Sequence, residues 1–386
     1  MWRSLASNML TILAIVLFLL AGVILWGKAQ YTAEGPLETA ICLRVERGST
    51  LTRVSRELEE QGAITSGTIF RVGADYSDKS GHLKAGSFLL REDASMEEIV
   101  AQITRGGAST CGTEIVYRVG VTRTQVEVRE LDPATRTFVE KAEFDLKSGE
   151  FPEVFVQKQA QADTRFRIAV AEGVTSWQVV DALKAIEVLG GEVGTRPQEG
   201  MLAPDSYEVA RGDDRGALLA EMQERQEQRI AETWAARREG LPFDTQEEML
   251  ILASIIEKET GVPDERGQVA SVFINRLERG MRLQTDPTVI YGITKGEGVL
   301  GRGLRQSELR RVTPWNTYVI EGLPPTPIAN PGLASLQAAV APEETDFVFF
   351  VADGSGGHAF AATLEEHNRN VAKWRQIEAD RQNSSD

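Results

Sequence analysis

The sequence predicts an α+β protein held by one N-terminal transmembrane helix. Three observations lead to this: an uncharged apolar run opens the chain, a small unit alternates strand and helix patterns, and amphipathic helices in the C-terminal half are separated by polar, proline-rich loops. Because 386 residues exceed one core of usual size, several parts are expected. We predict a cytoplasmic stub and anchor (1–29), a small α+β module (40–106), a β-rich insertion (112–160) and a mixed α+β domain (165–386).

The bulk composition excludes some classes of protein. The net charge is −15, which argues against a nucleic-acid partner, since DNA- and RNA-binding proteins need a basic surface. The chain has three His and two Cys, without Cys-x-x-Cys or His-x-x-x-His spacing, so a structural zinc site is not expected. We expect no metal and no cofactor.

The N-terminus predicts a membrane anchor. No charge occurs in Leu5–Trp26, and Met9–Trp26 contains one polar residue. Eighteen helical residues span about 27 Å, enough to cross the hydrocarbon core of a bilayer. A cleaved signal peptide is the alternative, although no clear small-x-small site follows. Arg3 slightly favours a cytoplasmic N-terminus over the flank at Lys28. We therefore expect a single-pass anchor with residues from about 30 onward outside the cytoplasm, which in a bacterium means the periplasm or the outer face.

The module at 40–106 combines strand and helix signals after a linker at 27–38. Ser95 and Glu98 form a capping box that opens the last helix. The expected elements are a strand at 41–45, helices at 51–61 and 66–75, a strand at 84–90 and a helix ending near Thr104. Cys42 and Cys111 would lie in an oxidising compartment, where a disulfide is permitted, but the sequence cannot give the distance between them.

The segment 112–160 is rich in Val, Thr, Phe and Ile with period-two stretches. Strands are expected at 114–119, 124–130, 137–146 and 153–157. A strand at 166–170, a Glu172-Gly173 turn and a helix at 177–189 then repeat the pattern of 43–61. Gene duplication and convergent capping explain this repeat equally well. An amphipathic helix is expected at 215–238.

The helix that begins at the capping box of Thr245 and Glu248 carries the candidate catalytic residue. An apolar stretch precedes Glu257, which lies where the hydrophobic surface ends. Partial burial favours the protonated form of a carboxyl, and such a group can act as a general acid. The alternative is an ordinary solvated glutamate. Glu259 points to the other side of the helix, so it cannot pair with Glu257.

Three polar segments follow, at 281–292, 313–318 and 321–332. Their Asn, Gln, Thr, Asp, Tyr and Pro residues predict rigid loops whose hydrogen-bonding groups suit a carbohydrate. These polar side chains could equally form hydrogen bonds with the backbone of their own loops. Between residues 276 and 311, eight basic residues stand against four acidic ones, which suggests an anionic ligand or a local network of ion pairs.

Four strings in this region resemble one known family, the MltG (YceG-like) endolytic murein transglycosylases. They are EGMLAPDSYEV (199–209), ASIIEKETGVPDERGQVASVFINRLERGMRLQTDPTVIYG (253–292), NTYVIEGLPPTPIANPG (316–332) and FFVADGSGGHAFAATLEEHN (349–368). In the first, Met-Leu-Ala replaces a more usual aromatic residue. The resemblance covers 165–386 strongly and 40–106 in pattern only, and it does not account for 112–160.

The resemblance implies a fold, a location and a reaction. It implies an inner-membrane anchor, a LysM-like module at 40–106 and a catalytic domain at 165–386 outside the cytoplasm. Glu257 would be the catalytic acid that cleaves the MurNAc–GlcNAc β-1,4 bond within nascent glycan strands. The products would have 1,6-anhydroMurNAc ends, and elongation would stop. Peptidoglycan synthases are expected partners.

One carboxyl suffices for this chemistry: Glu257 protonates the leaving oxygen and then accepts the proton of the C6 hydroxyl as the anhydro ring closes. The other candidates, for substrate contact, are Ser254, Gln284, Asp286, Tyr291, Asn316, Asn330, His358 and His367. Ser254 could orient Glu257. Two alternatives remain open: a muramidase with Asp286 as second carboxylate, and a non-catalytic peptidoglycan-binding scaffold of the wall-synthesis machinery.

Overall fold

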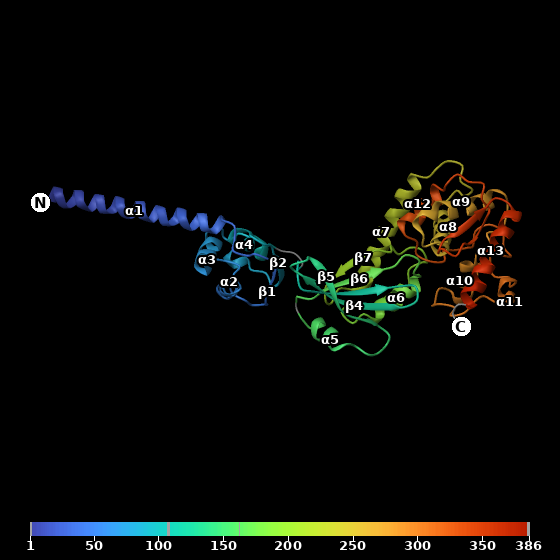
Figure 1. Ribbon diagram of the computed structural model, residues 1–386, viewed down its shortest axis with the longest axis horizontal. Helices are drawn as coiled ribbons and strands as arrows, with labels where there is room; N and C mark the ends of the chain where they lie inside the picture. The colour runs from blue at the N-terminus through green and yellow to red at the C-terminus, as the bar shows by residue number, and fades with distance from the viewer. Residues whose placement is uncertain (1, 106–108, 162, 384–386) are drawn as a thin grey trace. The chain divides into compact units, whose positions relative to one another are not determined.

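The structure is a computed structural model that describes residues 2–105, 109–161 and 163–383 (Figure 1). The chain forms two compact units. The first comprises Met1–Val116, Glu127–Phe144 and Glu150–Phe166, and the second comprises Tyr117–Val126, Asp145–Gly149 and Arg167–Asp386. Each unit contains a hydrophobic core of its own.

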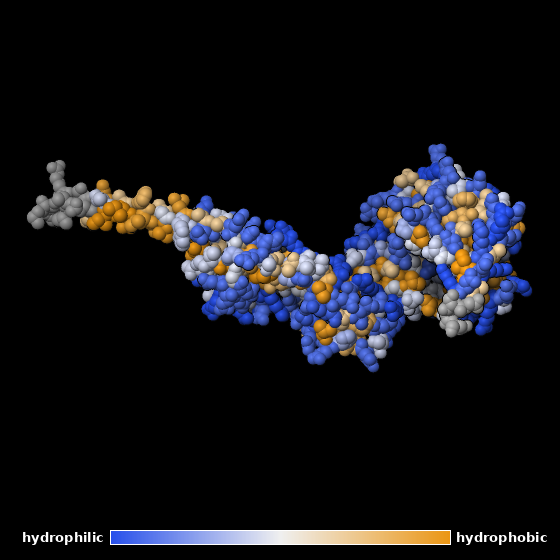
Figure 2. Space-filling model, viewed as in Figure 1, coloured by the Kyte–Doolittle hydropathy of each residue, from blue (hydrophilic) through white to orange (hydrophobic). Residues whose placement is uncertain are grey.

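Helix α1 (Trp2–Thr32) opens the first unit. Its segment Met9–Thr32 contains an 18-residue window with a mean hydropathy of 2.8 and, by length and composition, could cross a membrane. Figure 2 shows hydrophobic residues along it. The helix continues past the predicted anchor, so the expectation of a linker from residue 27 is wrong. Tyr31 is buried, with its ring against Gly73 of α3 (Gly67–Tyr76), because the end of α1 packs on the following module.

The predicted α+β module is present. Strands β1 (Ile41–Val45) and β2 (Gly86–Leu90) pair antiparallel, with Leu43 opposite Phe88. The remaining elements are α2 (Leu51–Glu60), α3, η1 (Ser80–His82) and α4 (Met96–Thr104). Apolar side chains of the strands and of α2, α3 and α4 form one core. The strands and helices predicted here are confirmed to within a few residues, and the likeness to LysM stays a prediction.

Hydroxyl side chains set the starts of these helices. Thr50 accepts a hydrogen bond from the backbone of Arg53 at the start of α2. Ser95 and Glu98 form the predicted capping box at the start of α4, each side chain accepting from the backbone N–H of the other. These bonds satisfy N–H groups that have no partner within the helix.

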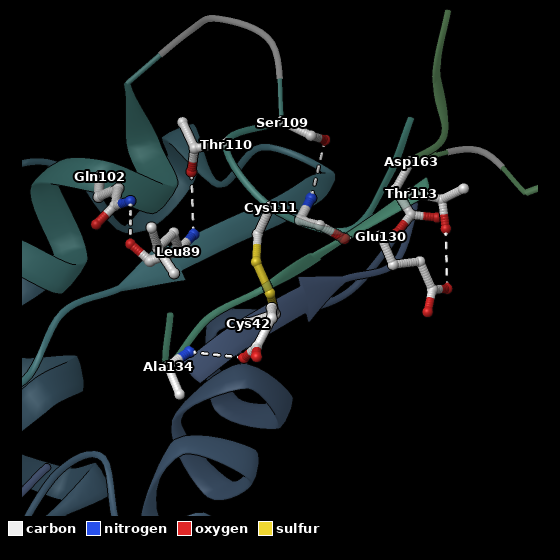
Figure 3. Close-up of a disulfide and its surroundings, with 12 residues drawn as sticks. Cys42, Leu89, Gln102, Ser109, Thr110, Cys111, Thr113, Glu130, Ala134 and Asp163 are labelled. Atoms are coloured by element: carbon white, nitrogen blue, oxygen red, sulfur yellow. Dashed lines mark hydrogen bonds between the residues drawn. A yellow bond between two sulfur atoms is a disulfide. The ribbon is translucent and has the colours of Figure 1, made fainter. Parts of the chain in front are cut away.

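A disulfide joins Cys42 of β1 to Cys111 across 69 residues (Figure 3). Their Cα atoms are 5.8 Å apart, within the usual range. The backbone N–H of Cys111 donates to the carbonyl of Ser87 on β2, which places the second cysteine beside the two-stranded sheet. The disulfide between Cys42 and Cys111, which the sequence left open, is therefore present.

A five-stranded sheet has the order β5-β4-β3-β6-β7. Its strands are β3 (Thr113–Val119), β4 (Thr124–Asp132), β5 (Thr137–Asp145), β6 (Arg165–Val170) and β7 (Ser206–Val209). The strands predicted within 112–146 are confirmed. Since β3 neighbours β6, the segment predicted as an insertion shares its sheet with strands from the predicted C-terminal domain.

The strand predicted at 153–157 is wrong. Residues Glu153–Gln159 form helix α5, which follows Pro152. Phe155 is buried and packs against Phe144 and Phe151 with ring centroids 4.9 and 5.7 Å away. The alternation of Val, Phe and Val resembles a strand, but the contacts of Phe155 with two aromatic rings decide which side of this short segment is buried.

The second unit consists mainly of helices. After β6 come α6 (Ser176–Ala185), α7 (Arg215–Ala235), α8 (Gln246–Glu259), η2 (Pro263–Glu265), α9 (Arg266–Glu278), α10 (Asp286–Thr294), α11 (Gln306–Leu309), α12 (Leu333–Val340), β8 (Phe349–Ala352), β9 (His358–Ala361) and α13 (Leu364–Asn383). Helices α8, α9 and α12 supply most residues of one hydrophobic core in this unit. The predicted helices are confirmed, although α6 ends earlier than expected. Part of the first predicted polar loop is helix α10, which Pro287 opens.

Candidate active site

Helix α8 carries Glu257 to the edge of the core. Thr245 and Glu248 form the predicted capping box at its start. Every residue of Met249–Ile256 is buried, and Glu257 is the first residue after this run that is only partly buried. Its side chain therefore lies where the apolar surface ends, as the sequence predicts.

The carboxylate of Glu257 is held by the start of α12. The backbone N–H of Gly332, the N-cap residue, donates to Oε2 at 3.0 Å, and the hydroxyl of Ser335 donates to the same oxygen at 2.7 Å. The positive end of the helix dipole also favours a carboxylate here. Since Oε2 already accepts two hydrogen bonds, a proton on Glu257 would be carried by Oε1. Neither Gly332 nor Ser335 was among the predicted site residues.

The expectation that Ser254 orients Glu257 is wrong. Ser254 is completely buried. Its hydroxyl donates to the carbonyl of Ile251 at 2.7 Å and accepts from the N–H of Ile328 at 3.0 Å. These bonds tie α8 to the segment before α12, so Ser254 supports the site from within the core and is not placed to touch a substrate.

The turn after β6 forms the second wall of the site. Gly173 has φ of +76°, and a Cβ there would lie 3.6 Å from Cγ of Glu257. The Gly173 N–H donates to the carbonyl of Asn330, and the Asn330 N–H donates to that of Val174, both at 2.9 Å. This pair of backbone bonds joins the turn to the segment that leads into α12.

Asn330, predicted to contact substrate, is fully buried and has another role. Its amide nitrogen donates to the carbonyl of Val174 at 2.8 Å, and its amide oxygen accepts from the N–H of Leu202 at 2.9 Å. The side chain thus connects three segments. Direct contact with a substrate is excluded by this burial.

A second carboxyl, Glu172, lies beside Glu257. Its side chain lies against Gly332 and fills the space where a Cβ of that residue would be. Partial burial and the negative charge of Glu257 raise the pKa of Glu172, and the charges of Arg266 and Arg229 oppose this. Sequence reasoning missed Glu172, although the repeated strand–glycine–helix pattern had singled out its turn.

Lys258 and Glu199 extend this charged group. The ammonium of Lys258 donates to the carbonyl of Gly173 at 3.2 Å; burial lowers the pKa of Lys258, while Glu257 and Glu199 raise it. Glu199 accepts from the N–H of Ser176 at 2.7 Å, and burial raises its pKa. The phenol of Tyr291, a predicted site residue, donates to Glu199 at 3.3 Å.

Glu259 belongs to a different cluster. The hydroxyl of Thr285 donates to it, and burial followed by the charge of Asp286 raises the pKa of Glu259. Asp286 itself accepts from the phenol of Tyr318 at 2.6 Å. The expected divergence of Glu257 and Glu259 is confirmed by these separate partners. Asp286, the second carboxylate of the muramidase alternative, neighbours Glu259, whereas the neighbour of Glu257 is Glu172.

The remaining predicted contacts do not converge on Glu257. Gln284 is exposed with φ of +50°. Asn316 is fully buried, and its amide nitrogen donates to three backbone carbonyls. His358 bonds Glu265 through its backbone N–H at 2.7 Å and its Nδ1 at 2.8 Å. His367 stacks on Phe349, and burial lowers its pKa.

Much of the polar region satisfies itself. The Thr317 hydroxyl accepts from the N–H of Thr285 at 3.0 Å and lies 2.9 Å from that of Thr288. In the basic stretch, Arg276 donates to the carbonyls of Val348 and Leu283. No group of three or more His, Cys, Asp or Glu residues in the described part of the chain could hold a metal ion.

The sequence model of the YceG-like family matches residues 43–373, most of the chain. This chain belongs to the YceG-like family. The family resemblance predicted from the four strings is therefore confirmed.

Relatives of this YceG-like protein carry a common name. The endolytic murein transglycosylase of Bacillus subtilis is 28% identical over 357 residues, covering 92% of this chain and 91% of that protein. The endolytic murein transglycosylase of Streptococcus pneumoniae (strain D39) is 29% identical over 86% of this chain, which spans 58% of that longer protein. A crystal structure of a yceG-like protein from Listeria monocytogenes is 24% identical, with a TM-score of 0.47, over 86% of this chain and 99% of that one.

Proposed function

We propose that this YceG-like protein is an endolytic murein transglycosylase with Glu257 as its catalytic acid and base. One observation carries the proposal: a partly buried carboxyl at the end of a buried helix, fixed through one oxygen by the start of α12, with the other oxygen left to carry a proton. Membership of a family whose named relatives are endolytic murein transglycosylases supports it.

In the proposed reaction one proton leaves Glu257 and one proton later returns to it. Glu257 donates its proton to the oxygen that links C1 of MurNAc to GlcNAc, and the C1–O bond breaks. The acetamido group of the sugar assists at C1. Glu257, now ionised, accepts the proton of the C6 hydroxyl while O6 bonds to C1. The bonds and protons balance without water, and an anhydro ring ends the new fragment.

The two hydrogen bonds to Oε2 suit this cycle. Gly332 and Ser335 stabilise the carboxylate that forms when the proton leaves, and they fix the plane of the carboxyl group. Both donors sit on one helix end that packs on α8, so they need little reorganisation during the reaction.

We further propose that α1 is a single-pass anchor in the inner membrane and that the rest of the chain is periplasmic. The length and apolar surface of α1 suit an anchor. The Cys42–Cys111 disulfide suits an oxidising compartment. The substrate would be nascent glycan strands, and peptidoglycan synthases that make them would be neighbours.

Cleavage and binding can be separated with one preparation. The full chain in detergent is incubated with uncrosslinked glycan strands, and their length distribution is followed by size-exclusion chromatography. An endolytic enzyme shortens long strands to fragments of intermediate length, with few disaccharides at early times. Strands that co-sediment with the protein but keep their length would support the scaffold alternative instead.

A further inference from the structure

Gly332 is in contact with two carboxyl groups. Its N–H donates to Glu257, and its Cα lies against the carboxyl of Glu172. Its φ of −73° would allow any residue, so the reason for a glycine is the space that Glu172 occupies. The turn at Gly173 holds Glu172 there through its backbone bonds to Asn330.

The charges around Glu172 come from three helices. Glu257 and Lys258 face the turn from α8, Arg266 from α9 and Arg229 from α7. The described part of the chain shows no ion pair or hydrogen bond to the Glu172 carboxyl, and the residue is exposed to solvent. The burial of Glu172 and the charge of Glu257 raise its pKa more than the two arginines lower it.

We propose that Glu172 is a second carboxyl of the active site and that Glu172 and Glu257 together carry one proton, which Glu257 delivers to the leaving oxygen. The inference rests on the proposed transglycosylase reaction. Two adjacent carboxylates resist losing both protons, because the second ionisation places two negative charges together. Glu172 acts through Glu257 and is therefore a positioning residue.

The proton balance of the reaction is unchanged. One proton passes from the pair to the leaving oxygen, and the C6 hydroxyl returns one proton to the pair. In the intermediate state both carboxylates are ionised, and their mutual repulsion strengthens Glu257 as the base that closes the ring. Glu172 thus favours the second step without forming a bond to the sugar.

The pH profile of cleavage tests the proposal. In Glu172→Gln the remaining carboxyl has lost its negative neighbour, so kcat/KM should begin to fall at a lower pH on the alkaline side, by about one pH unit at low ionic strength. Above that pH the rate should be about tenfold below wild type. Glu172→Asp should restore part of the shift, and added salt should reduce it. If the alkaline fall of kcat/KM has the same midpoint in wild type and in Glu172→Gln, and calorimetry shows that both proteins are folded, the proposal is contradicted.

The products provide a second readout. Glu172→Gln should still form anhydro ends, because Glu257 performs both proton transfers. A change from anhydro ends in wild type to reducing ends in Glu172→Gln would contradict the assigned role, since Glu172 would then control ring closure itself. Glu247→Gln, an exposed glutamate in the first turn of α8, is the matched control and should leave the profile unchanged.

A titration that needs no activity separates this inference from the proposed function. The carboxyl carbon of Glu172 is assigned in the full chain by the NMR signal lost in Glu172→Gln. The midpoint of its pH titration should be lower in Glu257→Gln than in wild type, because the charge that raises the pKa of Glu172 is removed. An unchanged midpoint rejects the pair even if the protein cleaves glycan. A lowered midpoint in a protein that never cleaves supports the pair and rejects the transglycosylase.

Discussion

The turns after β1 and after β6 share a backbone design and differ in their surroundings. Gly48 and Gly173 have φ of +78° and +76°, and each is followed two residues later by a threonine that caps a helix. A Cβ on Gly48 would meet nothing within 4 Å, whereas one on Gly173 would meet Glu257 and Lys258.

The two turns also differ in the chemistry of the residue that precedes each glycine. Arg47 precedes the glycine in the first turn and Glu172 in the second; both are exposed, but only Glu172 lies beside another carboxyl. Local sequence therefore specifies the turn and the helix start in both places. The proposed active site lies only at the second, where α8 and the segment that enters α12 close around the turn. The proposed function depends on the contacts that tertiary packing adds to this common local motif.

The largest expected effect is on catalysis at the second turn. Glu257→Gln keeps the hydrogen-bonding shape of the side chain but removes the proton donor, so strand cleavage should fall by about 10²–10⁴-fold. The rate is measured on glycan strands, with Glu247→Gln as control. Full activity in a folded Glu257→Gln protein would show that Glu257 is not the catalytic residue. The proposed functional difference between the two turns would then be contradicted.

Removal of the disulfide should affect the first unit alone, which contains the first turn. Cys42→Ser with Cys111→Ser is expected to destabilise the first unit by about 4 kcal/mol in the chain-entropy model, because a long loop is no longer closed. Hydrogen exchange should accelerate in α2 and stay unchanged in α6. Equal acceleration in both helices would show that the two units do not unfold independently.

Ser335→Ala should weaken the site without disturbing the fold. It removes a hydrogen bond to the carboxylate of Glu257, which is worth about 1.5–3 kcal/mol and corresponds to roughly a tenfold to hundredfold loss in kcat/KM. Ser55→Ala is the matched change in α2, where a buried serine donates to Thr52. It should change stability only; a similar loss of activity would point to a general effect on folding.

The two glycines offer a direct test of the comparison. Gly48→Ala and Gly173→Ala each force a side chain into the left-handed region and should reduce stability by about 1–2 kcal/mol. Only Gly173→Ala should also lower cleavage, since its Cβ would touch Glu257. Thermal unfolding and cleavage are measured on both, and a defect in cleavage for both would break the distinction.

The smallest effects are expected at the caps. Thr50→Ala should reduce stability by about 1 kcal/mol. Thr175→Ala should reduce it by roughly twice that, because the hydroxyl of Thr175 also donates to the carbonyl of Gly296 at 2.7 Å. Equal losses in urea titrations would mean that this second bond adds nothing.

Local signals in the sequence predicted most of the elements. Capping boxes at Ser95 and Thr245 placed helix starts, and the apolar run before Glu257 placed that residue at the edge of a core. The errors arose where packing decides. The segment at 153–157 became a helix because Phe155 packs on other aromatic rings, and α1 extended because Tyr31 packs on α3.

The site was predictable only in part. Helix periodicity predicted that Glu257 and Glu259 point to different sides of α8, and in the structure the two side chains bond different partners. Ser335 and Glu172 lie 78 and 85 positions from Glu257, so no local pattern could pair them with it. Asn316 and Asn330 were expected at a substrate, but amides can equally satisfy buried backbone groups, and the composition of a loop does not distinguish these uses.

Mass spectrometry of the fragments released by wild type and Glu257→Gln tests the central claim most directly. If Glu257 both protonates the leaving oxygen and accepts the C6 proton, wild-type fragments end in 1,6-anhydroMurNAc, one water lighter than a reducing end, and Glu257→Gln releases almost none. Fragments from wild type that end in reducing MurNAc, or equal amounts of anhydro ends from the variant, would contradict the account.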